Sequence, residues 1–167
     1  SRSIGIEIVN GGHDVPLSDG TLPPYPDAQI AAVIALCKGI LSRHDIPASR
    51  VVAHSDIAPA RKTDPGEHFP WARLAAEGVG LWPSSAPLSL DESSLMPGDS
   101  GPAVSDLQNM LRAIGYGLEA NGTYDETTRL VISAFQRRYV PVQITGAAYP
   151  ETLKRVAHVY GLVAGPA

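Results

Sequence analysis

The first apolar segment of the chain is Ser3-Ile4-Gly5-Ile6-Glu7-Ile8-Val9-Asn10. Its isoleucines recur at every second position, so they share one face of an extended backbone. This period of two predicts a β-strand. Glu7 is the only charged residue inside the segment, and it lies on the opposite face with Gly5 and Val9.

The carboxylate of Glu7 has two interpretations. A lone glutamate on a strand commonly faces solvent, and this is the simpler one. Gly5 on the same face favours the other, because a glycine leaves open space beside the carboxylate for a closely approaching ligand.

The rest of the first half alternates between helix and strand. Apolar residues at helical spacing predict a helix from about 28 to 43, with Asp27 as its cap. A short strand is predicted over residues 50–54 and a short helix over 71–77. The order strand, helix, strand is typical of an α/β unit.

The second half has a different pattern. Residues 83–101 are rich in proline, serine and glycine, which is linker composition. Three helices are predicted after it, beginning near Pro102, Asp125 and Pro150. Their apolar stripes indicate a small all-α three-helix domain.

Two features repeat within the predicted helical domain. Gln108 and Gln136 each follow a predicted core residue, where a side-chain amide can hold a turn together. Glycine precedes threonine by six positions in both Gly122–Thr128 and Gly146–Thr152. A turn followed by a helix cap explains both, and an internal duplication is one interpretation of the repeat.

Composition excludes several classes of protein. The 167 residues carry a formal charge of −4, whereas a nucleic-acid surface needs a basic patch. The longest apolar run, residues 30–37, is far shorter than the roughly 20 residues of a membrane helix. The single cysteine, Cys37, allows neither an internal disulfide nor a four-cysteine metal site.

A histidine and an aspartate could bind a metal together. His54 ends the second predicted strand, and a loop bracketed by Pro59 and Pro65 could return Asp64 to that strand end. Imidazole and carboxylate are both zinc ligands. Lys62 could project into the same space. The alternative is that His54 is a structural, hydrogen-bonded residue.

Longer stretches resemble a known enzyme family. The segment 3–8, the stretch His54-Ser55-Asp56-Ile57-Ala58-Pro59-Ala60-Arg61-Lys62-Thr63-Asp64-Pro65-Gly66 and the stretch Phe69-Pro70-Trp71 resemble zinc-dependent N-acetylmuramoyl-L-alanine amidases of type 2. These amidases share a fold with peptidoglycan recognition proteins. Several residues of the second half resemble the three-helix peptidoglycan-binding domain, among them Leu107-Gln108, Gly122-Thr123-Tyr124-Asp125, Phe135-Gln136 and Thr152-Leu153.

The resemblance implies a zinc site and its catalytic residues. The family binds zinc through two histidines and an aspartate, and His54 and Asp64 match the second histidine and the aspartate. The first histidine precedes the strand of Glu7 in the family. We therefore expect an upstream segment of the same protein to pair with this strand and to supply a histidine. Glu7 matches the acidic catalytic residue, and Lys62 matches the lysine beside the aspartate ligand.

The resemblance also implies an architecture. The predicted fold is an α/β amidase body, a mixed sheet with flanking helices whose N-terminal part is absent from this chain, followed by the all-α three-helix domain. The predicted parts are residues 1–82 of the amidase, a linker over 83–100, and a peptidoglycan-binding domain over 101–167.

The implied activity is zinc-assisted hydrolysis of the amide between N-acetylmuramic acid and L-alanine of the stem peptide. The expected partners are peptidoglycan or its muropeptide fragments and the upstream segment, without nucleic acid. The expected location is the bacterial cell envelope, periplasmic or associated with the outer membrane. The alternatives are a non-catalytic peptidoglycan-binding protein and an inactive fragment that lacks the first zinc ligand.

Overall fold

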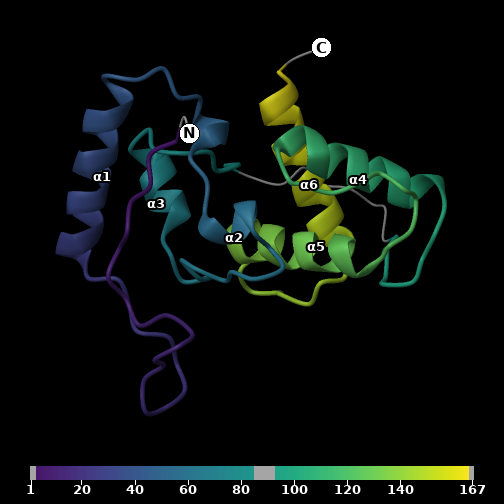
Figure 1. The fold of residues 1–167 in the computed structure, drawn as a ribbon, viewed down its shortest axis with the longest axis horizontal. Coiled ribbons are helices and arrows are strands. Elements are labelled where there is room, and N and C mark those ends of the chain that lie inside the picture. Colours follow the sequence, from purple (N-terminus) through teal and green to yellow (C-terminus); the bar gives the residue numbers. More distant parts are fainter. Residues whose placement is uncertain (1–2, 85–92, 166–167) are drawn as a thin grey trace.

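The computed structural model describes residues 3–84 and 93–165, and all its regular elements in these ranges are helices (Figure 1). In chain order they are α1 (Asp27–Leu41), the 3₁₀ helix η1 (Ala48–Arg50), α2 (His54–Ile57), α3 (Trp71–Ala76), α4 (Pro102–Ile114), α5 (Glu126–Tyr139) and α6 (Pro150–Ala164).

The predicted α/β body with a mixed sheet is wrong for the described residues, which contain no strand and no sheet. Residues 3–10 have no regular secondary structure. A period of two predicts a backbone conformation, but a strand also needs a neighbour that completes its hydrogen-bonded ladder. No described segment supplies such a neighbour, and Ile4 and Ile6 are accordingly exposed at 54% and 37%.

The second strand, predicted over residues 50–54, is also absent from the structure, and short helices lie at both ends of this range. Arg50 closes η1, and His54 begins α2. The backbone between them is held by side chains instead of a neighbouring strand. Arg138 Nη2 donates to the carbonyl of Val51 at 2.9 Å, and the amide of Ala53 donates to Asp56 Oδ2 at 2.8 Å.

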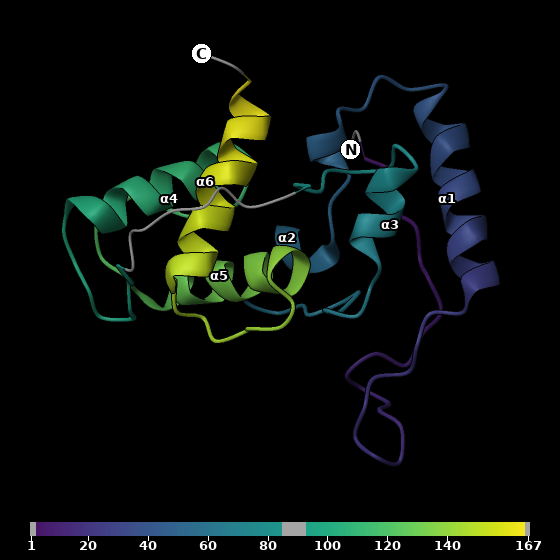
Figure 2. The same ribbon diagram turned by 180° about the vertical axis from the view of Figure 1, so that it is seen from behind.

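One hydrophobic cluster, which we call the N-terminal cluster, lies around α1 and α3. Both views show these two helices side by side at one end of the molecule (Figures 1 and 2). Three residues of the apolar stripe predicted for residues 28–43 are buried here, and Cys37 and Leu41 are partly buried against them. The buried members of the N-terminal cluster are Ile30, Val33, Ile34, Ala53, Phe69, Trp71, Leu74 and Val79.

A second, larger cluster, which we call the C-terminal cluster, is enclosed by α4, α5 and α6. All three helices lie where the sequence predicts them. Pro102 starts α4 and Gly115 ends it with φ +127°, a left-handed conformation that favours glycine. Leu111, Phe135 and Val156, one from each helix, are fully buried in this cluster.

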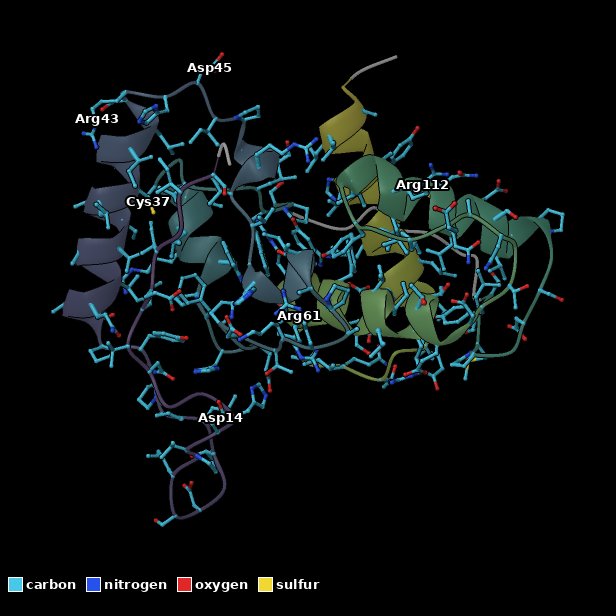
Figure 3. All side chains as sticks on the ribbon, viewed as in Figure 1. Asp14, Cys37, Arg43, Asp45, Arg61 and Arg112 are labelled. Atoms are coloured by element: carbon cyan, nitrogen blue, oxygen red, sulfur yellow. The ribbon has the colours of Figure 1, made fainter. Side chains whose placement is uncertain are left out.

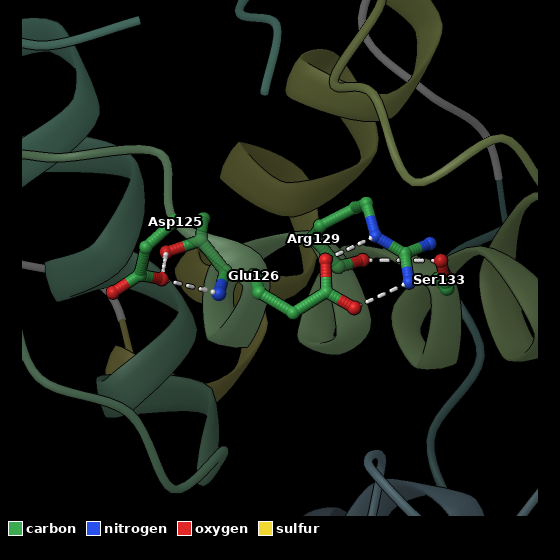
Figure 4. A network of polar contacts seen from close by, with 5 residues as sticks. Asp125, Glu126, Arg129 and Ser133 are labelled. Carbon is green, nitrogen blue, oxygen red and sulfur yellow. Dashed lines mark hydrogen bonds and ion pairs between the residues drawn. The ribbon is translucent and has the colours of Figure 1, made fainter. Parts of the chain in front are cut away.

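The start of α5, predicted near Asp125, is fixed by a side-chain cap. Asp125 Oδ1 accepts hydrogen bonds from the amide and the hydroxyl of Thr128 at 2.9 and 3.0 Å (Figure 4). One turn later, Arg129 pairs with Glu126 at 2.6 Å on the surface of the same helix. These contacts satisfy the first turn of α5 and set its register.

Gln108 holds the turn before α5, as its position after a core residue predicts. Its amide nitrogen donates to the carbonyl of Thr123 at 2.9 Å and to the hydroxyl of Thr128 at 2.9 Å. Its carbonyl accepts from the amide of Gly122 at 2.9 Å.

Gln136 repeats this pattern at the turn before α6. Its amide nitrogen donates to the carbonyl of Ala147 and to the hydroxyl of Thr152, and its carbonyl accepts from the amide of Gly146. Three bonds of each network correspond: one to a backbone carbonyl, one to a threonine hydroxyl and one from a glycine amide. This match supports an internal duplication of a helix-and-turn unit.

The two clusters meet at α2 and α5. Both views place α2 beside α5, between the two ends of the molecule (Figures 1 and 2). Trp82 packs against both clusters. Of the predicted linker 83–100, residues 85–92 lie outside the described residues, whereas Leu95 exchanges two backbone hydrogen bonds with Ala148.

In the ranges that the structure covers, no helix is long and apolar enough to span a membrane.

Candidate active site

The structure brings His54 and Asp64 together. His54 is the first residue of α2, and Asp64 lies in the loop between α2 and α3. His54 Nδ1 and Asp64 Oδ2 are 3.1 Å apart. Their side chains are 43% and 56% exposed, so both remain accessible to an ion or a substrate from solvent.

Backbone hydrogen bonds return the loop to α2. The amide of Lys62 donates to Ala58 at 3.0 Å, and the amide of Ser55 donates to the carbonyl of Asp64 at 3.1 Å. The second bond joins the residue after His54 directly to Asp64. The pairing of the two side chains is therefore fixed by the backbone as well as by their own contact.

Gly66 closes the same loop and admits no side chain. Its φ is +88°, and an added Cβ would lie 2.8 Å from His68 Nδ1. The ring of His68 stacks on Tyr25 with centroids 4.9 Å apart, and the hydroxyl of Tyr25 donates to the carbonyl of Pro65 at 2.9 Å. The loop that carries Asp64 is thus anchored to the chain that precedes α1.

On the other side, α2 is anchored by a buried ion pair with α5. Arg138 Nη1 donates to Asp56 Oδ2 at 2.7 Å, and the two side chains are 3% and 8% exposed. Tyr116, after the end of α4, donates its hydroxyl to Asp56 Oδ1 at 2.8 Å. Both carboxylate oxygens of Asp56 are therefore bonded to the C-terminal half of the chain.

Aromatic rings surround the Arg138 guanidinium. Its central carbon lies 4.1 Å from the ring centroid of Trp71 and 5.0 Å from that of Tyr139, which are cation–π distances. Burial alone would lower the pKa of Arg138, but the Asp56 carboxylate holds it above the ordinary value. Burial and the same carboxylate raise the pKa of Tyr116 well above its usual range.

Sequence reasoning did not single out Asp56, Tyr116 or Arg138. A signal was present, because Arg138 follows Val131 and Phe135 by seven and three positions and so shares their buried stripe on α5. A charge on an apolar stripe predicts a buried partner.

The other two predicted site residues lie apart from these bonds. Glu7 is exposed and Lys62 is half-buried. Neither side chain has a hydrogen bond or ion pair with another residue in the part of the chain that the structure describes. A Cβ added to the exposed Gly5 would meet nothing within 4 Å.

A second histidine–carboxylate pair joins the segment before α1 to the loop between α2 and α3. His13 Nε2 is 3.1 Å from Glu67 Oε2. His13 does not join His54 and Asp64 in one cluster, since residues 3–84 and 93–165 hold no group of three or more metal-binding side chains. His54–Asp64 and His13–Glu67 are therefore separate pairs of side chains whose types can bind a metal ion.

Beside the loop of Asp64, the surface is hollowed. A hollow of about 320 Å³ lies between residues 57–61 and α5, and it shares Gly117 and Thr127 with a larger one of about 530 Å³. Arg61 lines the first hollow and Arg112 the second, and Figure 3 shows these two cations beside α2 and on α4.

Comparison with known families assigns both halves of the chain. Residues 1–67 match the family described as N-acetylmuramoyl-L-alanine amidase, and residues 100–156 match the peptidoglycan-binding domain family.

Individual relatives agree with these matches. The chain is 39% identical over 150 residues to N-acetylmuramoyl-L-alanine amidase AmiD of Escherichia coli K12, covering 90% of this chain and 54% of the relative. It is 41% identical over 75 residues to the 1,6-anhydro-N-acetylmuramyl-L-alanine amidase AmpD of Enterobacter cloacae, covering 44% of this chain and 35% of that one. The chain thus spans about half the length, or less, of these relatives.

Two solved structures resemble the fold. E. coli AmiD with anhydro-N-acetylmuramic acid-L-Ala-D-γ-Glu-L-Lys matches 85% of this chain and 55% of its own, with a TM-score of 0.67 and 35% identity. AmpDh3 of Pseudomonas aeruginosa with anhydromuramic pentapeptide matches 93% and 60%, with a TM-score of 0.71 and 34% identity. Residues 1–67 therefore resemble a segment of the N-acetylmuramoyl-L-alanine amidase family, and residues 100–156 resemble the peptidoglycan-binding domain family.

Proposed function

We propose that the protein containing this chain hydrolyses the amide bond between N-acetylmuramic acid and L-alanine of the peptidoglycan stem peptide. The observation that carries the proposal is the 3.1 Å approach of His54 Nδ1 and Asp64 Oδ2 within the segment that matches the amidase family. The family match and the similarity to substrate-bound AmiD support the substrate class.

The donor atoms of this pair suit zinc. Imidazole nitrogen and carboxylate oxygen are ordinary zinc ligands, and a catalytic zinc commonly has three protein ligands and a water. His54 and Asp64 would supply two of the three. A histidine upstream of residue 1 stays our prediction for the third. When bound, zinc lowers the pKa of a coordinated water and polarises the scissile carbonyl.

The remaining steps fall to Glu7 and Lys62. The carboxylate of Glu7 would accept a proton from the attacking water and later pass it to the leaving amine of L-alanine. The ammonium of Lys62 would stabilise the negative oxygen of the tetrahedral intermediate. Neither side chain has a described partner that would have to be displaced first.

The C-terminal half would bind the cell wall. We propose residues 1–82 as amidase, 83–100 as linker and 101–167 as the wall-binding domain, in line with the matched segments. Attachment to the polymer raises the local concentration of substrate around the site. We propose that the polymer contacts the two hollows that Arg61 and Arg112 line. This substrate implies a cell-envelope location, periplasmic or at the outer membrane.

The rival function is peptidoglycan binding without cleavage. It would need no metal, whereas the amidase needs about one zinc per molecule. The test is zinc analysis of the full-length protein together with digestion of purified peptidoglycan, with release of stem peptides followed by mass spectrometry. Release of free peptides beginning with L-alanine, abolished by a chelator and restored by zinc, supports the proposal. Wall binding without zinc and without release would overturn it.

A further inference from the structure

We infer that Arg138, in the wall-binding half of the chain, is a positioning residue for the amidase reaction. It contacts neither His54 nor Asp64 in the described contacts. Its effect passes through Asp56, and the inference rests on the proposed function of the His54–Asp64 pair.

The first step is the bond between Arg138 and Asp56. Asp56 is the third residue of α2, and its Oδ2 also accepts from the amide of Ala53 at the residue before the helix. This contact caps the helix that begins at His54. Because Arg138 Nη1 bonds to the same oxygen at 2.7 Å, the cap and the ion pair share one atom.

The second step is the backbone before α2. Arg138 Nη2 donates to the carbonyl of Val51 at 2.9 Å, three residues upstream of His54. The guanidinium of Arg138 therefore donates hydrogen bonds to the chain both before and after His54. A planar group with two donors can do this, whereas a lysine ammonium cannot match the geometry.

The third step links α2 to Asp64. The amide of Ser55 donates to the carbonyl of Asp64, so this bond keeps the two proposed ligands together only while α2 holds its position and the bond stays intact. Trp71 of α3 packs against the face of Arg138 at 4.1 Å and prevents its withdrawal. The wall-binding half thereby sets the geometry of the metal pair.

The matched experiment compares Arg138→Met with Arg129→Met in the full-length protein. Both changes remove an arginine of α5 that is paired with a carboxylate, but Arg129 pairs with Glu126 on the surface and Arg138 pairs with Asp56 in the interior. Three properties are measured: amide hydrogen exchange by NMR, zinc affinity by chelator competition, and kcat and KM on a soluble muropeptide.

Arg138→Met is expected to speed exchange at the amides of Ala53 and Ser55 while α4 and α6 keep their protection. Zinc affinity should fall about tenfold or more, the scale for residues that orient metal ligands. kcat should fall more than KM rises, and binding to insoluble peptidoglycan should not change. Arg138→Lys should recover part of each loss, and Arg129→Met should behave as wild type.

Equal exchange and equal zinc affinity in the two methionine variants would overturn the inference. So would a uniform loss of protection in both clusters, which indicates a role in the fold as a whole. If Arg138→Met does not fold, Arg138→Lys and Tyr116→Phe are compared with Arg129→Met by the same three measurements. A wild-type protein that binds zinc without cutting defeats the proposed function, and the exchange and affinity data still decide this inference.

Discussion

Gln108 and Gln136 stand in equivalent positions of two successive turns, and each donates to one backbone carbonyl and one threonine hydroxyl while it accepts from one glycine amide. Both side chains are fully buried. Gln108 also donates to Asn121 Oδ1, and Gln136 also accepts from the amide of Thr145, so eight hydrogen bonds tie the turns before α5 and α6 to the helices that precede them.

Replacing either glutamine by leucine should destabilise the protein, because buried amides and hydroxyls would lose their partners. Each unsatisfied buried group costs about 1–3 kcal/mol, so Gln108→Leu and Gln136→Leu should each lower the free energy of unfolding by at least this amount. Urea denaturation followed by circular dichroism measures it. Gln143→Leu is the control, since its side chain makes no hydrogen bond with the described residues. Equal stability of all three variants would contradict the prediction.

Glu7→Gln should retain zinc and fold but lose most of the hydrolysis. The two side chains have nearly the same shape, and only the carboxylate can accept a proton. The expected loss in kcat is about 10²-fold or more, the scale of general-base catalysis. Turnover of a muropeptide by the full-length protein measures it, with zinc content as the internal control. Near-normal turnover would contradict the catalytic role of Glu7 and favour the interpretation that its side chain simply faces solvent.

His68 should make the folded state sensitive to acid. Burial lowers the pKa of His68 below its ordinary 6.5, although Glu67 acts in the opposite direction. The unfolded chain therefore takes up a proton before the folded one does. The contribution to stability is complete above about pH 7 and declines as the pH falls through 6.5 towards the lower folded value.

The measurement is chemical denaturation at a series of pH values from about 7 to about 5. His68→Gln should show a smaller loss of stability on acidification than the wild type. His44→Gln, the same substitution at an exposed histidine, is the control for the change of side chain itself. Identical slopes in the wild type and the His68 variant would exclude His68 as the source of the sensitivity.

Cutting the chain near Ser89 should leave unequal pieces. The helical piece keeps the whole C-terminal cluster and should fold and bind insoluble peptidoglycan in a pull-down. The piece before the cut loses Tyr116 and Arg138, the two side chains of the C-terminal half that bond to Asp56. We therefore expect this piece to melt at a lower temperature than the uncut chain. Adding the helical piece should raise that melting temperature, whereas a helical piece with Arg138→Met should not.

The helices could be predicted because their determinants are local. Periodic apolar residues, Pro102 and Asp125 at the starts, and Gly115 at an end are all read within one turn of the helix they affect. The strand of residues 3–10 could not be settled in this way, since an extended segment becomes a strand only when a neighbour pairs with it.

In the candidate site too, contacts that depend on nearby residues could be predicted, and contacts between distant residues could not. The approach of His54 to Asp64 depends on a short loop, and the two bracketing prolines indicate it. The link from Asp56 to Arg138 joins residues 82 positions apart; the stripe on α5 indicates that Arg138 has a buried partner, but no local pattern identifies that partner as Asp56. Neither the local sequence nor the described contacts place Glu7 beside His54 and Asp64.

The shared use of Arg138 has a consequence for building chimeric enzymes. Wall-degrading proteins look modular, which invites exchange of residues 101–167 for a module with affinity for another bacterial surface. Such a graft would remove both Tyr116 and Arg138 from Asp56, and we expect α2, which carries the proposed ligand His54, to lose its alignment. A graft that places both donors at matching positions on the incoming module should keep the proposed amidase half intact while its target changes.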